Sequence, residues 1–207
     1  MKILITAGPT REYIDPVRFI TNRSSGKMGY ALAEAAVARG WDTLLVTGPV
    51  DLPLPDGASV IGVETALQMA ASVKHNAPLC DAIVVAAAVA DYRPVEVLEH
   101  KLKKCSGGLT LRLERTEDIL ASLGEMKKPG QVLVGFAAET DDLIANAKKK
   151  LESKNLDWIA ANNVSDGFAS DTDRVTLLGR GGEVVELPLA PKSEVAEMIL
   201  DRVFGRK

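Results

Sequence analysis

The feature that most constrains this chain is a repeated alternation of short, nearly continuous apolar runs with longer segments of helical periodicity. Runs of this length are typical of strands buried on both faces of a parallel sheet. The expected strands are Lys2–Ala7, Thr43–Thr47, Ser59–Val63, Ala82–Ala87, Gln131–Ala137 and Trp158–Ala161. The expected helices are Ser25–Arg39, Ala66–Asn76, Glu117–Gly124, Asp142–Lys154 and Lys192–Phe204. The alternation predicts an α/β fold, a Rossmann-like, doubly wound, mostly parallel sheet in a three-layer αβα arrangement.

The C-terminal part of the chain departs from this rhythm. Two β-type runs, Arg174–Leu178 and Val184–Leu187, flank the dipeptide Gly181-Gly182 and predict an antiparallel hairpin. We expect this hairpin to extend the sheet edge or to meet a second subunit. No internal repeat or low-complexity linker interrupts the 207 residues, so the sequence predicts one domain over residues 1–207.

Composition excludes several classes of protein. The chain is 46% apolar and 26% charged, which is ordinary for a globular protein, and its net charge of −3 gives no global attraction to nucleic acid or to an anionic membrane. The apolar run at the N-terminus is too short for a signal peptide or a membrane span. Two cysteines, Cys80 and Cys105, are expected as free thiols in a reducing compartment. We therefore expect a cytoplasmic protein whose phosphate affinity comes from local Lys and Arg clusters.

Two irregular stretches, Gly8–Ser24 and Ala90–Gly108, follow predicted strands at the carboxyl edge of the sheet, where open α/β sheets bind ligands. The turn at Gly8 either serves as a phosphate loop or needs glycine only for its backbone conformation. A nicotinamide oxidoreductase is disfavoured, because the chain has no G-x-G-x-x-G, no acidic residue closing the second strand and no Tyr-x-x-x-Lys pair.

The segment Thr21–Gly29 resembles a P-loop without being one, because Thr21 replaces the glycine and Met28 the hydroxyl residue that Walker A requires. A helix N-terminus rich in small residues remains, and its backbone N–H groups suit an anion. The small residues are Ser24, Ser25 and Gly26. The alternative is that one of the serines simply caps the helix. Asn22, just before them, is an uncharged donor and acceptor that suits a carbonyl or carboxylate oxygen.

Charged residues near the second irregular stretch offer further contacts. Asp91 follows the fourth strand, where a carboxylate suits a ribose hydroxyl, a base amino group or Mg²⁺, the alternative being an Asx-turn. The run Lys101-Leu102-Lys103-Lys104 suits a lid over phosphates, although loop lysines are usually solvated. Lys150 and Lys154 share one helix face, either for a ligand or as a solvated surface.

Six blocks of the sequence, in this order, closely resemble the phosphopantothenoylcysteine synthetase family, the phosphopantothenate–cysteine ligases of coenzyme A biosynthesis. The blocks are Thr6–Glu12, Asp15–Arg18, Asn22–Gly29, Ala88–Pro94, Lys101–Lys104 and Gly135–Thr140. The resemblance spans nearly the whole chain. The flavin-dependent decarboxylase that is fused to this domain in many bacteria has no counterpart here, so no flavin is expected and a separate decarboxylase is a candidate partner.

The resemblance implies a two-step reaction with CTP and Mg²⁺. The carboxylate of 4′-phosphopantothenate attacks the α-phosphate and releases pyrophosphate, and the amine of L-cysteine then displaces CMP from the acyl-cytidylate. Such a site mainly positions the reactants and neutralises phosphate charge. Mg²⁺ would be held mainly through the triphosphate, with Asp91 as a further candidate ligand. Family members are dimers, so a homodimer is also implied.

By motif, the resemblance assigns Asn22 and Lys101 as catalytic residues, Asn22 at the substrate carboxylate and Lys101 at the triphosphate. The implied nucleotide-binding residues are Val85, Ala86, Ala87, Asp91, Lys101, Glu117, Asp118, Ile119, Leu120, Phe136, Lys150 and Lys154. The implied substrate-binding residues are Gly8, Asn22, Ser24, Ser25 and Gly26. Thr116-Glu117 stands where the family often has Asn-Pro, which departs from the pattern. A non-catalytic nucleotide-binding module is the remaining alternative, and it would release no pyrophosphate.

Overall fold

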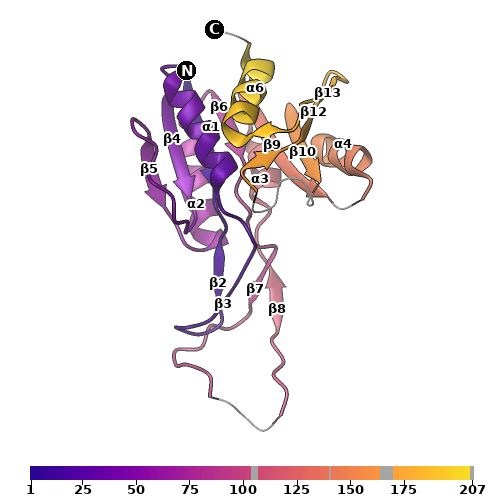
Figure 1. Cartoon of the computed structure of the whole chain (residues 1–207). Helices are drawn as coiled ribbons and strands as arrows, with labels where there is room; N and C mark the ends of the chain where they lie inside the picture. Colours follow the sequence, from indigo (N-terminus) through magenta and orange to yellow (C-terminus); the bar gives the residue numbers. More distant parts are fainter. Residues whose placement is uncertain (104–106, 140, 164–169, 206–207) are drawn as a thin grey trace.

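The computed structural model describes residues 1–103, 107–139, 141–163 and 170–205, and its centre is an eight-stranded sheet (Figure 1). In spatial order the strands are β13 (Val184–Glu186), β12 (Val175–Gly179), β10 (Trp158–Asn163), β9 (Val132–Glu139), β6 (Ala82–Val85), β1 (Lys2–Ala7), β4 (Asp42–Thr47) and β5 (Ser59–Gly62). The strands from β10 to β5 pair in parallel, and β12 and β13 are antiparallel. The predicted hairpin is thus confirmed, and it extends the sheet edge.

Helices cover both faces of the sheet, which confirms the three-layer prediction. On one face, α1 (Lys27–Ala38) and α6 (Lys192–Phe204) pack around buried side chains such as Leu32 and Ile199. The other face carries α2 (Ala66–Asn76), α3 (Ile119–Met126) and α4 (Leu143–Ser153), with a 3-10 turn at Ala77–Leu79. Because every central strand is buried on both faces, the sequence reads there as continuous apolar runs.

The element boundaries differ from the expected ones at the carboxyl edge. The strand expected at Ala82–Ala87 ends at Val85, and the first helix begins at Lys27 instead of Ser25. Its N-cap is Gly26, in the left-handed conformation at φ 76°, with no side-chain cap, so the alternative of a serine cap is wrong. The helix expected from Glu117 begins at Ile119, because the Asp118 side chain accepts a hydrogen bond from Ala121 N–H at 3.0 Å.

The two stretches expected to be irregular, together with the segment that follows the second one, contain short hairpin strands that project away from the sheet as an arm (Figure 1). The strands are β2 (Arg11–Tyr13), β3 (Phe19–Thr21), β7 (Tyr92–Pro94) and β8 (Leu113–Arg115). A further short pair, β11 (Thr172–Asp173) with β14 (Ala190–Pro191), lies next to α6. Three-residue strands carry too little periodicity to be recognised in a sequence.

The buried carboxylate of Asp15 holds the arm together. It accepts N–H groups from Val17 (2.8 Å), Arg18 (2.9 Å) and Leu102 (3.1 Å), and the Arg18 guanidinium donates to Leu102 O at 2.8 Å. Burial opposes ionisation of Asp15, but these N–H donors and Arg18 outweigh it and hold the pKa of the carboxyl below its usual value. Lys101 is exposed beside this anchor.

Two sequence expectations concern thiols and membranes. Cys80 is a buried free thiol whose pKa is raised by burial, while Cys105 lies outside the described residues. In the described part of the chain, no helix is long and apolar enough to cross a membrane.

Candidate active site

Glycines bring the start of α1 against the carboxyl end of β1. A Cβ at Gly29 would lie 2.5 Å from the Ala7 Cβ, so only glycine allows this close approach. A Cβ at Gly26 would lie 3.3 Å from the Gly8 Cα, and both glycines have positive φ. Gly8 therefore supports the backbone at Gly26, and it lines neither of the two cavities described below.

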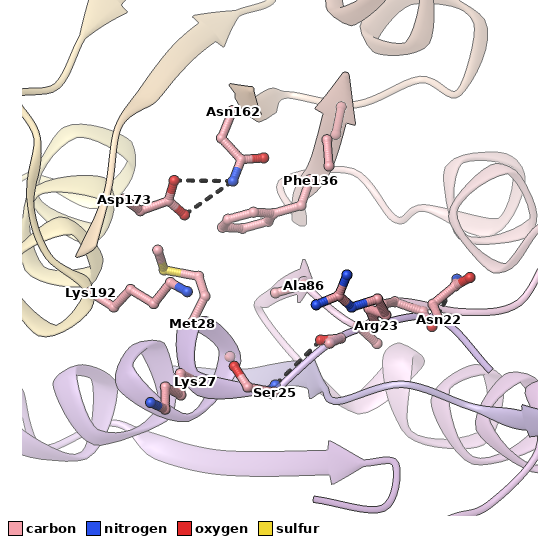
Figure 2. Close-up of a pocket in the computed structure, with 17 residues that line it drawn as sticks. Asn22, Arg23, Ser25, Lys27, Met28, Ala86, Phe136, Asn162, Asp173 and Lys192 are labelled. Carbon is pink, nitrogen blue, oxygen red and sulfur yellow. Dashed lines mark hydrogen bonds between the residues drawn. The ribbon is translucent and has the colours of Figure 1, made fainter. Parts of the chain in front are cut away.

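A cavity of about 480 Å³ lies between the start of α1 and the ends of β6, β9 and β10, and we call it the α1 cavity (Figure 2). It is lined by Asn22, Arg23, Ser24, Ser25, Gly26, Lys27, Met28, Gly29, Ala86, Ala87, Ala88, Phe136, Ala137, Ala138, Asn162, Asp173 and Lys192. The lining contains three cationic side chains and one carboxylate. Because Gly26 leaves the helix end without a side-chain cap, the first N–H groups of α1 add further positive potential.

A second cavity of about 480 Å³, which we call the α3 cavity, lies between the segments after β6 and β8 and the start of α3. It is lined by Val85, Ala87, Val89, Asp91, Tyr92, Arg115, Thr116, Glu117, Asp118, Ile119, Leu120, Phe136 and Lys154. This lining has three carboxylates and two cations, the reverse of the charge balance in the α1 cavity. The two cavities share Ala87 and Phe136, which form a ridge between them.

Buried threonines fix the segment that forms this ridge. The Thr6 hydroxyl accepts the Ala87 N–H at 3.1 Å, and the Thr10 hydroxyl accepts the Ala90 N–H at 3.0 Å. Thr116, where the family pattern has asparagine, donates its hydroxyl to Ala90 O at 2.5 Å and its N–H to Asp91 O at 3.0 Å. These two contacts fasten the loop that carries Asp91.

Asn22 lies beside the ridge. Its side-chain amide donates to Val89 O at 3.0 Å and to Ala88 O at 3.3 Å. These contacts tie the segment before α1 to the segment after β6. In this arrangement the side-chain oxygen is the atom left for a ligand, so a donor role for Asn22 requires an exchange of partners when an acyl oxygen enters.

The predicted nucleotide lysines are distributed unevenly. Lys154 lines the α3 cavity and pairs with Asp118 at 2.7 Å, whereas Lys150 pairs with Glu139 at 2.6 Å and lines neither cavity. Lys101 also lines neither cavity, and Lys104 lies outside the described residues. The structure therefore does not bring Lys101 or Lys150 to the other predicted residues.

The carboxylates next to α3 are already engaged. Both oxygens of Glu117 accept from Lys74 Nζ at 2.7 Å, and this contact, with the Ser122 hydroxyl, holds the pKa of Glu117 below its usual value. Burial raises the pKa of Asp118, but Lys154 and the Ala121 N–H outweigh it and leave a lowered pKa. Within the described ranges, no three His, Cys, Asp or Glu side chains gather as a metal site.

Sequence reasoning missed the wall of the α1 cavity opposite the helix start. Asn162, the residue of β10 before the final Asn163, donates to both oxygens of the buried Asp173 at 3.1 Å, and Lys192 begins α6 beside them (Figure 2). Asn162 could have been found, because it follows a predicted strand at the carboxyl edge. No sequence pattern indicated that Asp173 and Lys192 would line the cavity.

The fold and the paired cavities define this chain as a Rossmann-like α/β protein with a cation-rich cavity, a candidate ligand site, at the carboxyl edge of its sheet. The family model described as DNA/pantothenate metabolism flavoprotein C-terminal domain matches residues 1–206. The chain belongs to this family.

Several relatives are similar to the chain over nearly its whole length. The coenzyme A biosynthesis bifunctional protein CoaBC of Bacillus subtilis is 52% identical over 205 residues, which are 97% of this chain and 50% of that protein. The crystal structure of a CoaBC C-terminal domain is 48% identical, covers 98% of this chain and 93% of the other, and has a TM-score of 0.85. A Cab2 variant in complex with phosphopantothenate-cysteine, 21% identical, shares the fold at a TM-score of 0.82, with 99% of this chain and 85% of Cab2 covered. The chain spans about half the length of the curated relatives it matches.

Proposed function

We propose that the chain is a phosphopantothenate–cysteine ligase of coenzyme A biosynthesis, which uses CTP and forms an acyl-cytidylate. The observation that carries the proposal is the pair of adjoining cavities with opposite charge balance at the carboxyl edge, in a chain that is 52% identical to half of a coenzyme A biosynthesis protein. Two ligands that must react need neighbouring sites with a common boundary.

The charge balance suggests how the ligands are divided. The α1 cavity, with its cations and helix N–H groups, suits phosphopantothenate, which is anionic at both ends. The α3 cavity suits the uncharged base and ribose of the nucleotide, with Asp91 as acceptor for a hydroxyl or amino group. The substrate carboxylate and the α-phosphate would then meet at the ridge of Ala87 and Phe136, beside Asn22.

The chemistry that the family resemblance implies would have two steps in this placement. A carboxylate is a poor acyl electrophile, so one of its oxygens first attacks the α-phosphorus, and the bond to pyrophosphate breaks. The cysteine amine next attacks the acyl carbon, loses a proton, and the bond to CMP breaks. Asn22 would stabilise the negative charge that develops on the acyl oxygen in this second step.

The proposed reaction also requires Mg²⁺ and a cation at the triphosphate. Mg²⁺ would enter with the triphosphate and neutralise its charge, with Asp91 as a further candidate ligand. Lys101 would reach the triphosphate only if the arm changes position or a second copy supplies it. A homodimer, a separate decarboxylase partner and a cytoplasmic location remain predictions.

Pyrophosphate release tests the function directly. With 4′-phosphopantothenate and Mg²⁺, CTP should support release far better than ATP, because a buried polar group left unpaired by the wrong base costs about 1–3 kcal/mol. Each nucleotide is assayed with and without cysteine, and the amide product is measured by mass spectrometry. Equal rates with ATP would contradict the CTP preference. CTP binding without pyrophosphate release would support a non-catalytic nucleotide-binding module instead.

A further inference from the structure

The wall of the α1 cavity opposite the helix start carries a lysine to which the proposed function assigns no individual role. Lys192 is the first residue of α6, and only 8% of its surface is exposed. Figure 2 draws its ammonium group between the Asp173 carboxylate and Lys27, on the cavity side of α6. Its Nζ donates to Ser170 O at 2.7 Å, a contact that fixes the side chain along the wall.

The surroundings of this ammonium do not favour its charge strongly. Burial lowers the pKa of Lys192 and the positive charge of Lys27 acts in the same direction, while Asp173 and Asp171 raise it. Asp171 also pairs with Lys27, and both oxygens of Asp173 also accept from Asn162. A buried lysine at a cavity wall costs desolvation that an apolar residue would avoid, and an anionic ligand offsets this cost.

The remaining lining indicates what kind of anion fits. The lining also includes the Met28 side chain and Ala137 and Ala138, which provide no counter-charge. Across the cavity stand the serines that precede α1 and the uncapped backbone of its first turn. An anion with several acceptor oxygens, such as a phosphoryl group, can accept hydrogen bonds from both sides at once.

We infer that Lys192 binds a phosphoryl group in the α1 cavity from the wall opposite α1. The inference rests on the proposed function, and two of its reactants carry such a group. The group is either the 4′-phosphate of phosphopantothenate or the terminal phosphates of the nucleotide. Lys192 is then a ligand-binding residue contributed by the C-terminal helix, which none of the six family-like sequence blocks contains.

Binding by the full chain distinguishes the two sources. Dissociation constants for 4′-phosphopantothenate, for pantothenate and for CTP with Mg²⁺ are measured by calorimetry on the wild type and on Lys192→Met. Loss of a hydrogen bond to a charged group should weaken binding of the phosphorylated ligand about tenfold or more. Weaker phosphopantothenate binding with unchanged pantothenate binding assigns the 4′-phosphate. Weaker CTP binding alone assigns the triphosphate.

Controls separate this inference from general effects of charge and folding. Arg202→Gln removes a cation from an exposed position of the same helix and should change none of the constants. Lys192→Arg keeps the charge and should restore most of the lost affinity. If the methionine variant does not fold, Lys192→Gln, whose amide can still donate to Ser170 O, takes its place.

Two results have different meanings. Folded Lys192 variants that bind all three ligands as the wild type does would overturn the inference and leave the proposed function intact. A wild-type chain that binds neither phosphopantothenate nor CTP would overturn the proposed function itself.

Discussion

The α1 cavity and the α3 cavity have about the same volume and share a ridge, but their charges are opposite in balance. The first combines three cations with an uncapped helix start, and the second combines three carboxylates with two cations. Cavity size therefore gives no basis for assigning the two proposed reactants to the two cavities. Charge and backbone N–H groups give such a basis, because they decide where a phosphoryl or carboxylate group can leave water at low cost.

The two cavities can differ in charge and still adjoin because they share one segment of backbone. Both cavities are built on the segment after β6, which Thr6, Thr10 and Thr116 hold by hydrogen bonds. One side of this segment faces α1 and the other faces α3. Variants on each side should consequently affect different ligands, and a variant at the ridge should affect the reaction between them.

Asn22→Asp, beside the ridge, should have the largest effect. It replaces the amide donor with a carboxylate that repels an oxyanion, so transfer to cysteine should slow by about 10²–10³ while acyl-cytidylate still forms. The intermediate should accumulate and be detected by mass spectrometry after rapid separation. Asn76→Asp is the matched control, since the Asn76 amide also donates to a backbone carbonyl, at 2.8 Å, but lies away from both cavities. Equal loss of both steps in a folded Asn22 variant would refute the assigned role.

Lys101→Gln tests whether the arm joins the cavities during the reaction. If Lys101 stabilises the triphosphate, pyrophosphate release should slow by about tenfold or more, because one hydrogen bond to a charged group contributes about 1.5–3 kcal/mol. The fold should be unaffected because the residue is exposed. Lys149→Gln, at an exposed position of α4, is the control. An unchanged rate would mean that the lysine run is a solvated charge cluster.

Lys154→Gln should affect the α3 cavity alone. Its ammonium pairs with Asp118 at the cavity wall, and its loss should raise the KM for CTP by about threefold to tenfold, as expected for about 0.7–1.4 kcal/mol. The KM for phosphopantothenate should stay the same. Steady-state kinetics with each substrate varied in turn measure both constants. A rise in both KM values would contradict the division of ligands between the cavities.

Asp118→Asn should have the smallest effect, on stability. The folded-state pKa of Asp118 is lowered, so its ionised form contributes stability above the unfolded-state pKa of about 3.9, and this contribution is lost as pH falls through the folded pKa. At pH 7 the variant should be less stable by about 0.5–1 kcal/mol, through a weaker helix cap and the lost ion pair. Urea unfolding from pH 3 to pH 7 measures the difference, which should narrow at low pH. If the difference in stability between the variant and the wild type did not change with pH, the charge of Asp118 would not account for it.

Local sequence patterns determined the layered, mostly parallel sheet, the segments that form its central strands and the carboxyl edge as the place for a site. They succeed because burial on both faces leaves an apolar run, and a crossover helix leaves a 3.6-residue period. The hairpin around Gly182 was also predictable, because a Gly-Gly dipeptide separates two β-type runs. In the structure Gly182 has φ 97°, a conformation that favours glycine. The family-like blocks indicated Asn22, Asp91 and Phe136, which the fold places around one ridge.

Only the tertiary structure decided what surrounds those residues. Asp173 and Lys192 reach the α1 cavity because β12 pairs antiparallel with β10 and α6 returns beside α1, a convergence of distant segments that no local pattern records. The partners of Lys150 and Lys154, and the separation of Lys101 from both cavities, depend on three-dimensional distances between elements. Sequence spacing fixes which residues share a helix face or a strand end, whereas the charge balance of a cavity is a sum over segments that only folding brings together.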